Sequence, residues 1–236
     1  MSRIGRIIDW IAKHEQAVLA GWLVIVAVVW GFFELAGMVA QGSTQAFDER
    51  VVRALRCADD LARPIGPEGL TQFARDITAL GSYSALIVVV LISVLFLAAA
   101  QQRVALRTLF GATISGYAML LLLKQWFHRP RPEIVPHLAD FHSSSFPSGH
   151  AMMSAVIYVT LAFQLLRVIE PRQIRCAILV TAVLLTTLVG VSRVFLGVHY
   201  PTDVLAGWTA GLVWASLWLV LARRWQQTHD RPAEPS

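Results

Sequence analysis

Charged and ionisable residues stand at the edges of apolar segments in the second half of this sequence. The stretch SRVFLGVHYPTD, residues 192–203, places Arg193, His199 and Asp203 between two long apolar runs. A charged side chain deep in a bilayer costs about 3 kcal/mol or more on insertion scales, so such residues are rarely kept without a use. Their positions therefore indicate a functional site.

Three cations and two histidines of this region form a set that suits a phosphate dianion. Arg131 and Arg193 each offer planar, bidentate donors, and Lys124 offers a compact positive charge. Phosphoryl transfer depends mainly on positioning and on stabilising charge. Of the histidines His150 and His199, one can attack phosphorus and the other can protonate the leaving oxygen. The set predicts a phosphoryl-transfer site.

Two short motifs place part of this set at the beginnings of helices. In PSGH, Ser148 is a good N-cap and Gly149 leaves backbone N–H groups uncovered, which is typical of anion sites at helix N-termini. In HYPTD, Pro201 suits the first helical position and Asp203 the first turn. His199 then lies about one turn from Asp203, whose carboxylate can fix the tautomer and orientation of the imidazole.

Paired metal ions are the alternative chemistry, because many phosphatases use them. They need several convergent carboxylates or histidines. Near these helix ends only Asp203 is well placed, with Glu133 and Asp140 in the preceding loop. Cations occupy the places where metal ligands would be expected, so we predict metal-independent chemistry and no cofactor.

The composition indicates that membrane helices carry these residues. Apolar residues make up 56% of the 236 residues and charged residues only 15%, against roughly 25% charged in soluble domains. A soluble helical protein is disfavoured because so small a chain cannot bury all of its apolar runs, and the first run is too long for a signal peptide. We predict an all-α, polytopic membrane fold with six transmembrane helices at about 17–39, 83–100, 107–126, 149–167, 176–194 and 203–222.

An even number of spans places both chain termini on one side of the membrane. The short connecting loops on that side are basic, so the positive-inside rule favours cytoplasmic termini. This predicts a protein of the inner (plasma) membrane with its phosphate site on the periplasmic face. We expect one domain, 1–236, with a cytoplasmic N-terminus at 1–16, an outer interfacial segment at 41–82 and a flexible tail at 225–236.

The outer segment shows the periodicity of an amphipathic helix. FDERVVRALRCADDLA spaces Phe47, Val51, Leu55 and Ala58 at helical intervals with charges between them. We predict that this helix lies on the outer interface, and that a second short helix follows near EGLTQFARDITAL. The segment either forms a lid over the site or simply packs against the bundle.

The motifs together resemble a known family. K-x6-R-P at 124–132, P-S-G-H at 147–150 and S-R-x5-H-x3-D at 192–203 match, in order and without departure, the three-part signature of the type 2 phosphatidic acid phosphatase superfamily. The stretch ARDITALGS also resembles bacterial members. The resemblance implies a six-helix membrane fold with its active site at the outer leaflet. Soluble haloperoxidases share this site and hold vanadate in it, but the apolar spans argue against that branch.

Carried over by position, the resemblance implies roles for the motif residues. His199 would be the nucleophile that forms a phosphohistidine, Asp203 would orient it, and His150 would be the general acid. The residues implied to bind phosphate are Lys124, Arg131, Ser148, Gly149 and Arg193. The residues of the same loop that match no motif position, and that we expect to be ordinary loop residues or substrate contacts, are His128, Arg129, His137 and His142.

These features predict a membrane phosphatase that removes phosphate from a lipid phosphate or pyrophosphate. Its partners are the lipid substrate and membrane lipids, and we expect no nucleic acid. Phosphatidic acid, phosphatidylglycerol phosphate, undecaprenyl pyrophosphate and a lipid A phosphate all fit a pocket open to the bilayer. A transporter or receptor for phosphorylated anions and a lipid phosphotransferase are the alternatives. The sequence leaves the oligomeric state open.

Overall fold

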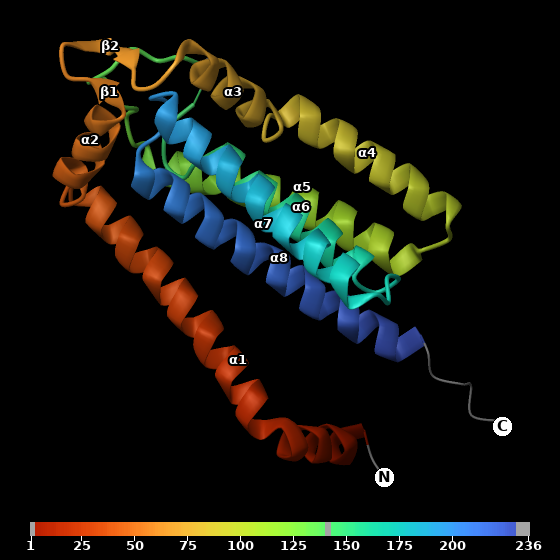
Figure 1. Ribbon diagram of the computed structural model, residues 1–236. Coiled ribbons are helices and arrows are strands. Elements are labelled where there is room, and N and C mark those ends of the chain that lie inside the picture. The colour runs from red at the N-terminus through yellow and green to blue at the C-terminus, as the bar shows by residue number, and fades with distance from the viewer. Residues whose placement is uncertain (1–2, 140–142, 230–236) are drawn as a thin grey trace.

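The structure is a helical bundle with short helices and a hairpin across one end (Figure 1). It is a computed structural model that describes residues 3–139 and 143–229, with side chains described for residues 19, 23–139 and 143–225. Its elements in chain order are α1 (Arg3–Ala40), α2 (Gln45–Ala54), β1 (Arg56–Cys57), β2 (Asp60–Pro64), α3 (Glu68–Ala79), α4 (Tyr83–Ala99), α5 (Arg103–Phe127), α6 (Gly149–Leu165), α7 (Arg172–Phe195) and α8 (Pro201–His229).

Several helices are long and apolar enough to cross a bilayer, as expected of a multi-pass membrane protein. Within the described residues, α1, α5, α7 and α8 each pass this test alone. α3 and α4 pass it only as a pair, bent by 45° at their junction. α6 is apolar but has 17 residues, a length of about 26 Å at 1.5 Å per residue. The described helices thus give four or five membrane-length spans, and six crossings stay a prediction.

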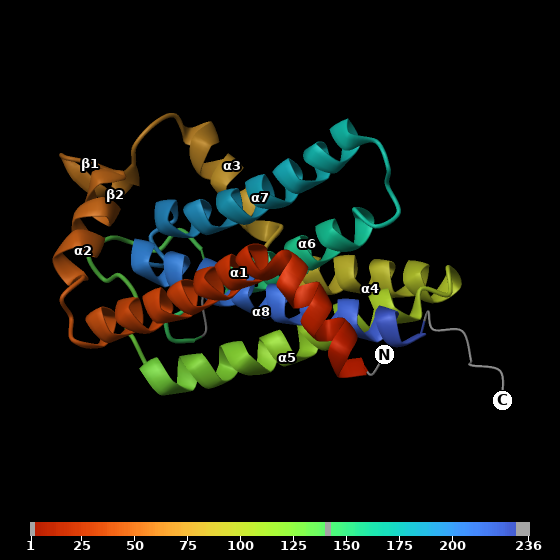
Figure 2. The ribbon, with the colours of Figure 1, turned by 90° about the horizontal axis from the view of Figure 1, so that it is seen from below.

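Helix α6 lies at the centre of the bundle, against α5, α7 and α8 (Figures 1 and 2). Met152 and Val156 of α6 are completely buried, which is typical of a helix that is apolar on all sides. A Cβ atom at Gly207 would lie 2.7 Å from the carbonyl oxygen of Ser148, and one at Gly211 would lie 2.5 Å from that of Met152. These glycines let α8 approach the backbone of α6, as small residues do between membrane helices.

The outer segment between α1 and α4 differs from its prediction. The helix predicted through residues 47–62 ends at Ala54, and an antiparallel hairpin of β1 and β2 follows. The all-α expectation is therefore wrong at this point. Aspartate side chains compete for backbone groups in turns, and Oδ1 of Asp60 accepts a hydrogen bond from the N–H of Ala62 at 2.8 Å. The second predicted helix is present as α3.

The buried face of α2 also differs from the predicted stripe. Asp48 and Val52 are buried, whereas Phe47, predicted to lie on the apolar face, is 53% exposed. The face that meets the bundle therefore carries a carboxylate. An apolar Phe47 pointing away from the protein is compatible with an interfacial position in the membrane, which stays a prediction.

Both ends of the chain are more helical than predicted. α1 begins at Arg3, so most of the predicted N-terminal segment 1–16 is helical. It packs along α8 and diverges from the other helices toward its own N-terminal end (Figure 1). The flexible tail is predicted from residue 225, and α8 continues into it as far as His229, through a stretch without Gly or Pro. Residues 230–236 lie outside the described residues.

Candidate active site

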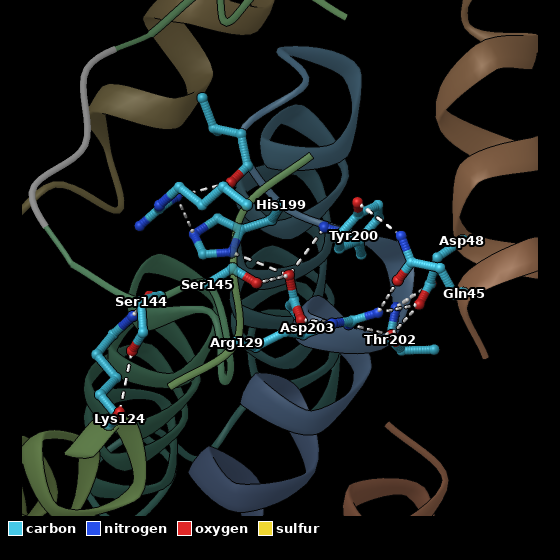
Figure 3. Close-up of polar contacts among 12 residues, drawn as sticks. Gln45, Asp48, Lys124, Arg129, Ser144, Ser145, His199, Tyr200, Thr202 and Asp203 are labelled. Atoms are coloured by element: carbon cyan, nitrogen blue, oxygen red, sulfur yellow. Dashed lines mark hydrogen bonds and ion pairs between the residues drawn. The ribbon is translucent and has the colours of Figure 1, made fainter. Parts of the chain in front are cut away.

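Four helix ends meet at the end of the bundle that carries the outer segment (Figure 1). Lys124 lies in the last turn of α5 and Arg193 in the last turn of α7, whereas Gly149 begins α6 and Asp203 lies in the first turn of α8. Figure 3 shows Lys124, His199 and Asp203 in one cluster. The alternating direction of the helices therefore gathers the motif residues on one face, as the sequence predicts.

His199 lies buried in this cluster, with 1% of its surface exposed. Its Nε2 atom lies 3.2 Å from Nη1 of Arg131, and its Nδ1 atom lies 3.5 Å from Oδ2 of Asp203, slightly beyond hydrogen-bond range. A guanidinium can only donate hydrogen bonds, so Nε2 must be the acceptor. We therefore assign the proton of the neutral imidazole to Nδ1, which faces the Asp203 carboxylate and leaves the Nε2 lone pair on the cationic side.

The Asp203 carboxylate is completely buried and held from several directions (Figure 3). Oδ2 accepts hydrogen bonds from the Ser145 hydroxyl at 2.8 Å and from the backbone N–H of Tyr200 at 2.9 Å. Oδ1 accepts one from Nη1 of Arg129 at 2.6 Å. Because Tyr200 directly precedes α8, its bond to Asp203 closes the first turn as in a capping box. The same contacts fix the carboxylate beside His199.

The three predicted phosphate-binding cations surround this centre, each anchored by the protein. Lys124 donates through Nζ to the carbonyl oxygen of Ser144. Arg131 donates to the carbonyl oxygens of Ser143 at 2.9 Å and Val198 at 2.6 Å. Arg193 donates to Oγ1 of Thr78 at 3.2 Å, and within the described residues its buried Nε has no hydrogen-bond partner. That N–H group is therefore available to an anion.

The beginning of α6 completes the cationic side. Ser148 is the N-cap residue, as predicted, but its side chain makes no capping hydrogen bond, and its buried Oγ has no partner within the described residues. A Cβ atom at Gly149 would lie 2.8 Å from the Tyr83 hydroxyl and 3.8 Å from Cε of Lys124. His150, in the first turn of α6, interacts electrostatically with His199 and with the three cations. The uncovered N–H groups here favour an anion.

Burial and the neighbouring cations set the protonation of the groups that lie outside the helices. Burial lowers the pKa of His199 well below its usual value, and the charges of Arg131, Arg193 and Lys124 lower it further. Burial also lowers the pKa of Arg131 to about 10. At neutral pH the imidazole of His199 is therefore unprotonated beside charged guanidinium groups, which is the state that a nucleophile requires.

Arg129 is the main residue that the sequence reading missed. Predicted to be an ordinary loop residue, it is buried and forms ion pairs with Asp203 at 2.6 Å and with Asp48 of α2 at 2.7 Å. Burial opposes its charge, but the two carboxylates outweigh this and raise the pKa of Arg129. The sequence did contain one sign of a buried partner for Arg129. Asp48 lies one helical turn before Val52, so the two side chains share a face of α2, and both are buried.

The other histidines of this loop lie at varied positions. His128 ends α5 in a left-handed conformation with φ of 42°, and Nε2 of His137 contacts the carbonyl oxygen of Pro132. His142 lies outside the described residues. In the part of the chain that the structure describes, no three His, Cys, Asp or Glu side chains group closely enough to hold a metal ion. Metal-independent chemistry stays a prediction.

Known proteins resemble this chain in sequence and in fold. The model of the PAP2 superfamily matches residues 104–227, which contain all three motifs. The chain belongs to the PAP2 superfamily. Phosphatidylglycerophosphatase B of Bacillus subtilis (strain 168) is 32% identical over 186 residues, or 77% of this chain and 86% of that protein. An undecaprenyl-diphosphatase of Sulfolobus acidocaldarius is 36% identical over 98 residues, or 42% of each protein.

A solved structure extends the likeness beyond the motifs. The crystal structure of a transmembrane PAP2 type phosphatidylglycerolphosphate phosphatase from Bacillus subtilis superposes with a TM-score of 0.76 and 27% sequence identity. The match covers 89% of this chain and 98% of that one. This PAP2 protein is therefore a multi-pass membrane phosphatase, a hydrolase of phosphoric monoesters or diphosphates.

Proposed function

We propose that this PAP2 phosphatase hydrolyses a lipid phosphate through a phosphohistidine on His199. The observation that carries the proposal is the orientation of that imidazole. Nε2 accepts from Arg131 at 3.2 Å on the cationic side, while Nδ1 faces Asp203 at 3.5 Å. A substrate phosphate that displaced the Arg131 contact would meet the Nε2 lone pair directly.

The proposed reaction has two displacements at phosphorus. Lys124, Arg131 and Arg193 hold the phosphate oxygens together with the N–H groups at the beginning of α6. Nε2 of His199 forms a bond to phosphorus as the bond to the lipid oxygen breaks, and His150 gives that oxygen a proton. Water, giving a proton back to His150, then attacks phosphorus and breaks the bond to His199. Inorganic phosphate leaves, and both histidines return to their first state.

A glycerophospholipid phosphate is the substrate class that we favour. Both matches named for phosphatidylglycerophosphate, a curated protein and a solved structure from Bacillus subtilis, cover most of this chain's length, whereas the undecaprenyl-diphosphatase match covers less than half of it. Phosphatidylglycerol phosphate is therefore the first candidate, ahead of phosphatidic acid, undecaprenyl pyrophosphate and a lipid A phosphate. All of these carry the phosphate at the end of a membrane-embedded chain.

We also propose that the site faces the periplasm, with both termini in the cytoplasm of an inner-membrane protein. At the bundle end opposite the site, one groove is lined by basic residues from the turn after α6, from α7 and from α8, namely Arg167, Arg175 and Arg223. Basic residues at helix ends favour the cytoplasmic side. At the site end, Phe47 and Phe73 of the outer segment are 53% and 51% exposed, which supports contact of this segment with the outer interface.

A transporter of phosphorylated anions has less support. Transporters usually bind their substrate near the bilayer midplane, on interrupted helices. Here the cations lie at one end of the bundle, with Lys124 and Arg193 in the last turns of α5 and α7 and Arg131 in the loop after α5. A phosphotransferase shares the first displacement with the hydrolase, and it is distinguished only by the acceptor in the second.

The test is phosphate release by the purified protein from a panel of the four lipids, in detergent and in the presence of EDTA. We expect the highest rate with phosphatidylglycerol phosphate and no activity in His199→Ala, with His137→Ala as the matched loop control. Labelled substrate should leave an acid-labile, alkali-stable phosphoryl group on wild type. Full activity of His199→Ala would end the proposed mechanism, and a phosphorylated alcohol as product would indicate a transferase.

A further inference from the structure

The ion pairs of Arg129 join the outer segment to the catalytic centre. We propose that Arg129 and Asp48 are positioning residues that lock the Asp203 carboxylate in the orientation that His199 requires. Through Asp48, α2 would then help to position the catalytic groups. The proposal rests on the proposed role of His199. Neither residue occupies a specified position of the K-x6-R-P, P-S-G-H or S-R-x5-H-x3-D motifs.

The guanidinium of Arg129 bridges the carboxylates of Asp48 and Asp203, and all three groups are buried. Nη1 of Arg129 donates to Oδ1 of Asp203 at 2.6 Å, and Nη2 donates to Oδ2 of Asp48 at 2.7 Å (Figure 3). Both carboxylates are completely buried, and Arg129 is 8% exposed. The guanidinium carbon also lies 4.4 Å from the centre of the Tyr200 ring. Planar geometry with several donors makes arginine suitable for such a bridge.

Asp48 does more than balance the charge of Arg129. Its Oδ1 accepts from the backbone N–H of Thr202 at 3.1 Å, and its Oδ2 accepts from the Thr202 hydroxyl at 2.6 Å. Thr202 is in the first turn of α8, where N–H groups have no partner within the helix. A side chain of α2 therefore caps the helix that carries Asp203. Docking of α2 and the position of Asp203 are thus mechanically linked.

Charge explains why the bridge is needed. Without Arg129, the buried carboxylates of Asp48 and Asp203 would lose the guanidinium that pairs with both, and removing one partner of a buried ion pair is strongly unfavourable. Asp203 would then take up a proton or move toward water. Either change removes the fixed anion from Nδ1 of His199, which selects the reactive tautomer. Arg129 holds Oδ1 and leaves Oδ2 facing the imidazole.

A purely structural ion pair would stabilise the fold without a selective effect on turnover, so kcat and KM must be measured separately. The variants are Arg129→Gln, Arg129→Lys and Asp48→Asn, with the best substrate of the lipid panel in detergent. The matched control is Arg53→Gln, which removes an exposed ion pair of α2 with Glu49 at 3.9 Å. Thermal unfolding and gel filtration in the same detergent report on folding.

We expect kcat to fall about a hundredfold in Arg129→Gln and about tenfold in Asp48→Asn, because small displacements of catalytic groups have effects of this size. KM should stay within about twofold, since neither residue touches the phosphate. Arg129→Lys should recover part of the loss by pairing with one carboxylate. Arg53→Gln should match wild type.

Wild-type kcat in folded Asp48→Asn or Arg129→Lys would overturn the proposal, and so would a rise in KM with a matching fall in kcat/KM at unchanged kcat. These two variants keep the test open if Arg129→Gln does not fold. An active His199→Ala would instead refute the nucleophile. The two failures are therefore distinguishable, because an inactive His199→Ala with a fully active Asp48→Asn counts against the lock alone.

Discussion

The hydroxyl group of Tyr83 lies 2.8 Å from the position that a Cβ atom would take at Gly149. Tyr83 begins α4 directly after the bend from α3, and Gly149 begins α6 at the proposed phosphate site. The Tyr83 ring also lies beside His150, with ring centroids 6.2 Å apart. A side chain at position 149 would therefore press on a rigid phenol where the substrate phosphate is proposed to bind.

Gly149→Ala should lower kcat/KM about tenfold, because the new methyl group displaces Tyr83 or shifts the beginning of α6 away from the phosphate. The measurement is phosphate release from the best lipid of the panel. In the double variant Gly149→Ala, Tyr83→Phe, loss of the hydroxyl removes the closest contact, so activity should recover in part. If the single variant has wild-type activity, the beginning of α6 is not held as closely to the phosphate as we propose.

Arg193→Lys should weaken phosphate binding about tenfold, or roughly 1.4 kcal/mol. The buried Nε of Arg193, without a partner among the described residues, lies in the cationic cluster and is lost in this variant. The measurement is competitive inhibition by inorganic phosphate, and Arg53→Lys on the exposed side of α2 is the control. An unchanged inhibition constant would show that Arg193 meets the anion only through its charge.

The pH–rate profile should be bell-shaped, with an acid limb of kcat/KM below pH 6.5. Burial, followed by the charges of Arg131, Arg193 and Lys124, lowers the pKa of His199, so the attacking imidazole stays neutral to lower pH than usual. In the proposed mechanism, the alkaline limb reports loss of the proton that His150 would give to the leaving oxygen. A rate that rises steadily into strong base would remove His150 from that role.

The same shift makes stability depend on pH. In the unfolded chain His199 takes up a proton below its ordinary pKa of about 6.5, whereas the folded protein resists protonation there. The unfolded state therefore gains protons first, and this contribution to stability is lost as the pH falls below about 6.5. His199→Gln should show a smaller loss of thermal stability than wild type between neutral and mildly acidic pH.

Gly211→Ala should destabilise the protein by about 1–3 kcal/mol, because overpacking forces backbones apart. Its Cβ would lie 2.5 Å from the carbonyl oxygen of Met152 and 2.7 Å from Cβ of Ala155. The control is Gly37→Ala in α1, where no atom lies within 4 Å of the added Cβ. Thermal unfolding in detergent should show a lower midpoint for the first variant only. Equal midpoints would mean that α6 and α8 can separate without loss.

The sequence predicted that the motif residues lie on one face of the bundle, because this follows from the alternating direction of successive membrane helices. Apolar runs mark helices, helices alternate in direction, and the ends that carry Lys124, His150 and Asp203 must then share a face. The motifs of the resembled family fall on the same residues. The N-cap at Ser148 followed from residue preference alone. None of these inferences required knowledge of a contact between distant side chains.

Arg129 and the hairpin could not be predicted in this way. The partner of Arg129 on α2, Asp48, is 81 residues distant, and its burial shows only when the orientation of α2 is known. A one-residue rotation of the predicted stripe, from Val51 to Val52, turns Asp48 from a surface charge into a buried one. The end of α2 at Ala54 depends on local turn bonds of aspartates, which compete closely with helix formation.

The cap that Asp48 provides for α8 has a consequence for biosynthesis. The ribosome makes Asp48 154 residues before Thr202, its partner in the last described helix. A nascent chain that ends before α8 lacks both Asp203, which faces the proposed nucleophile His199, and Thr202, the partner of Asp48. If Asp203 orients His199 as we propose, the site is complete only after α8, the last described helix, has been made.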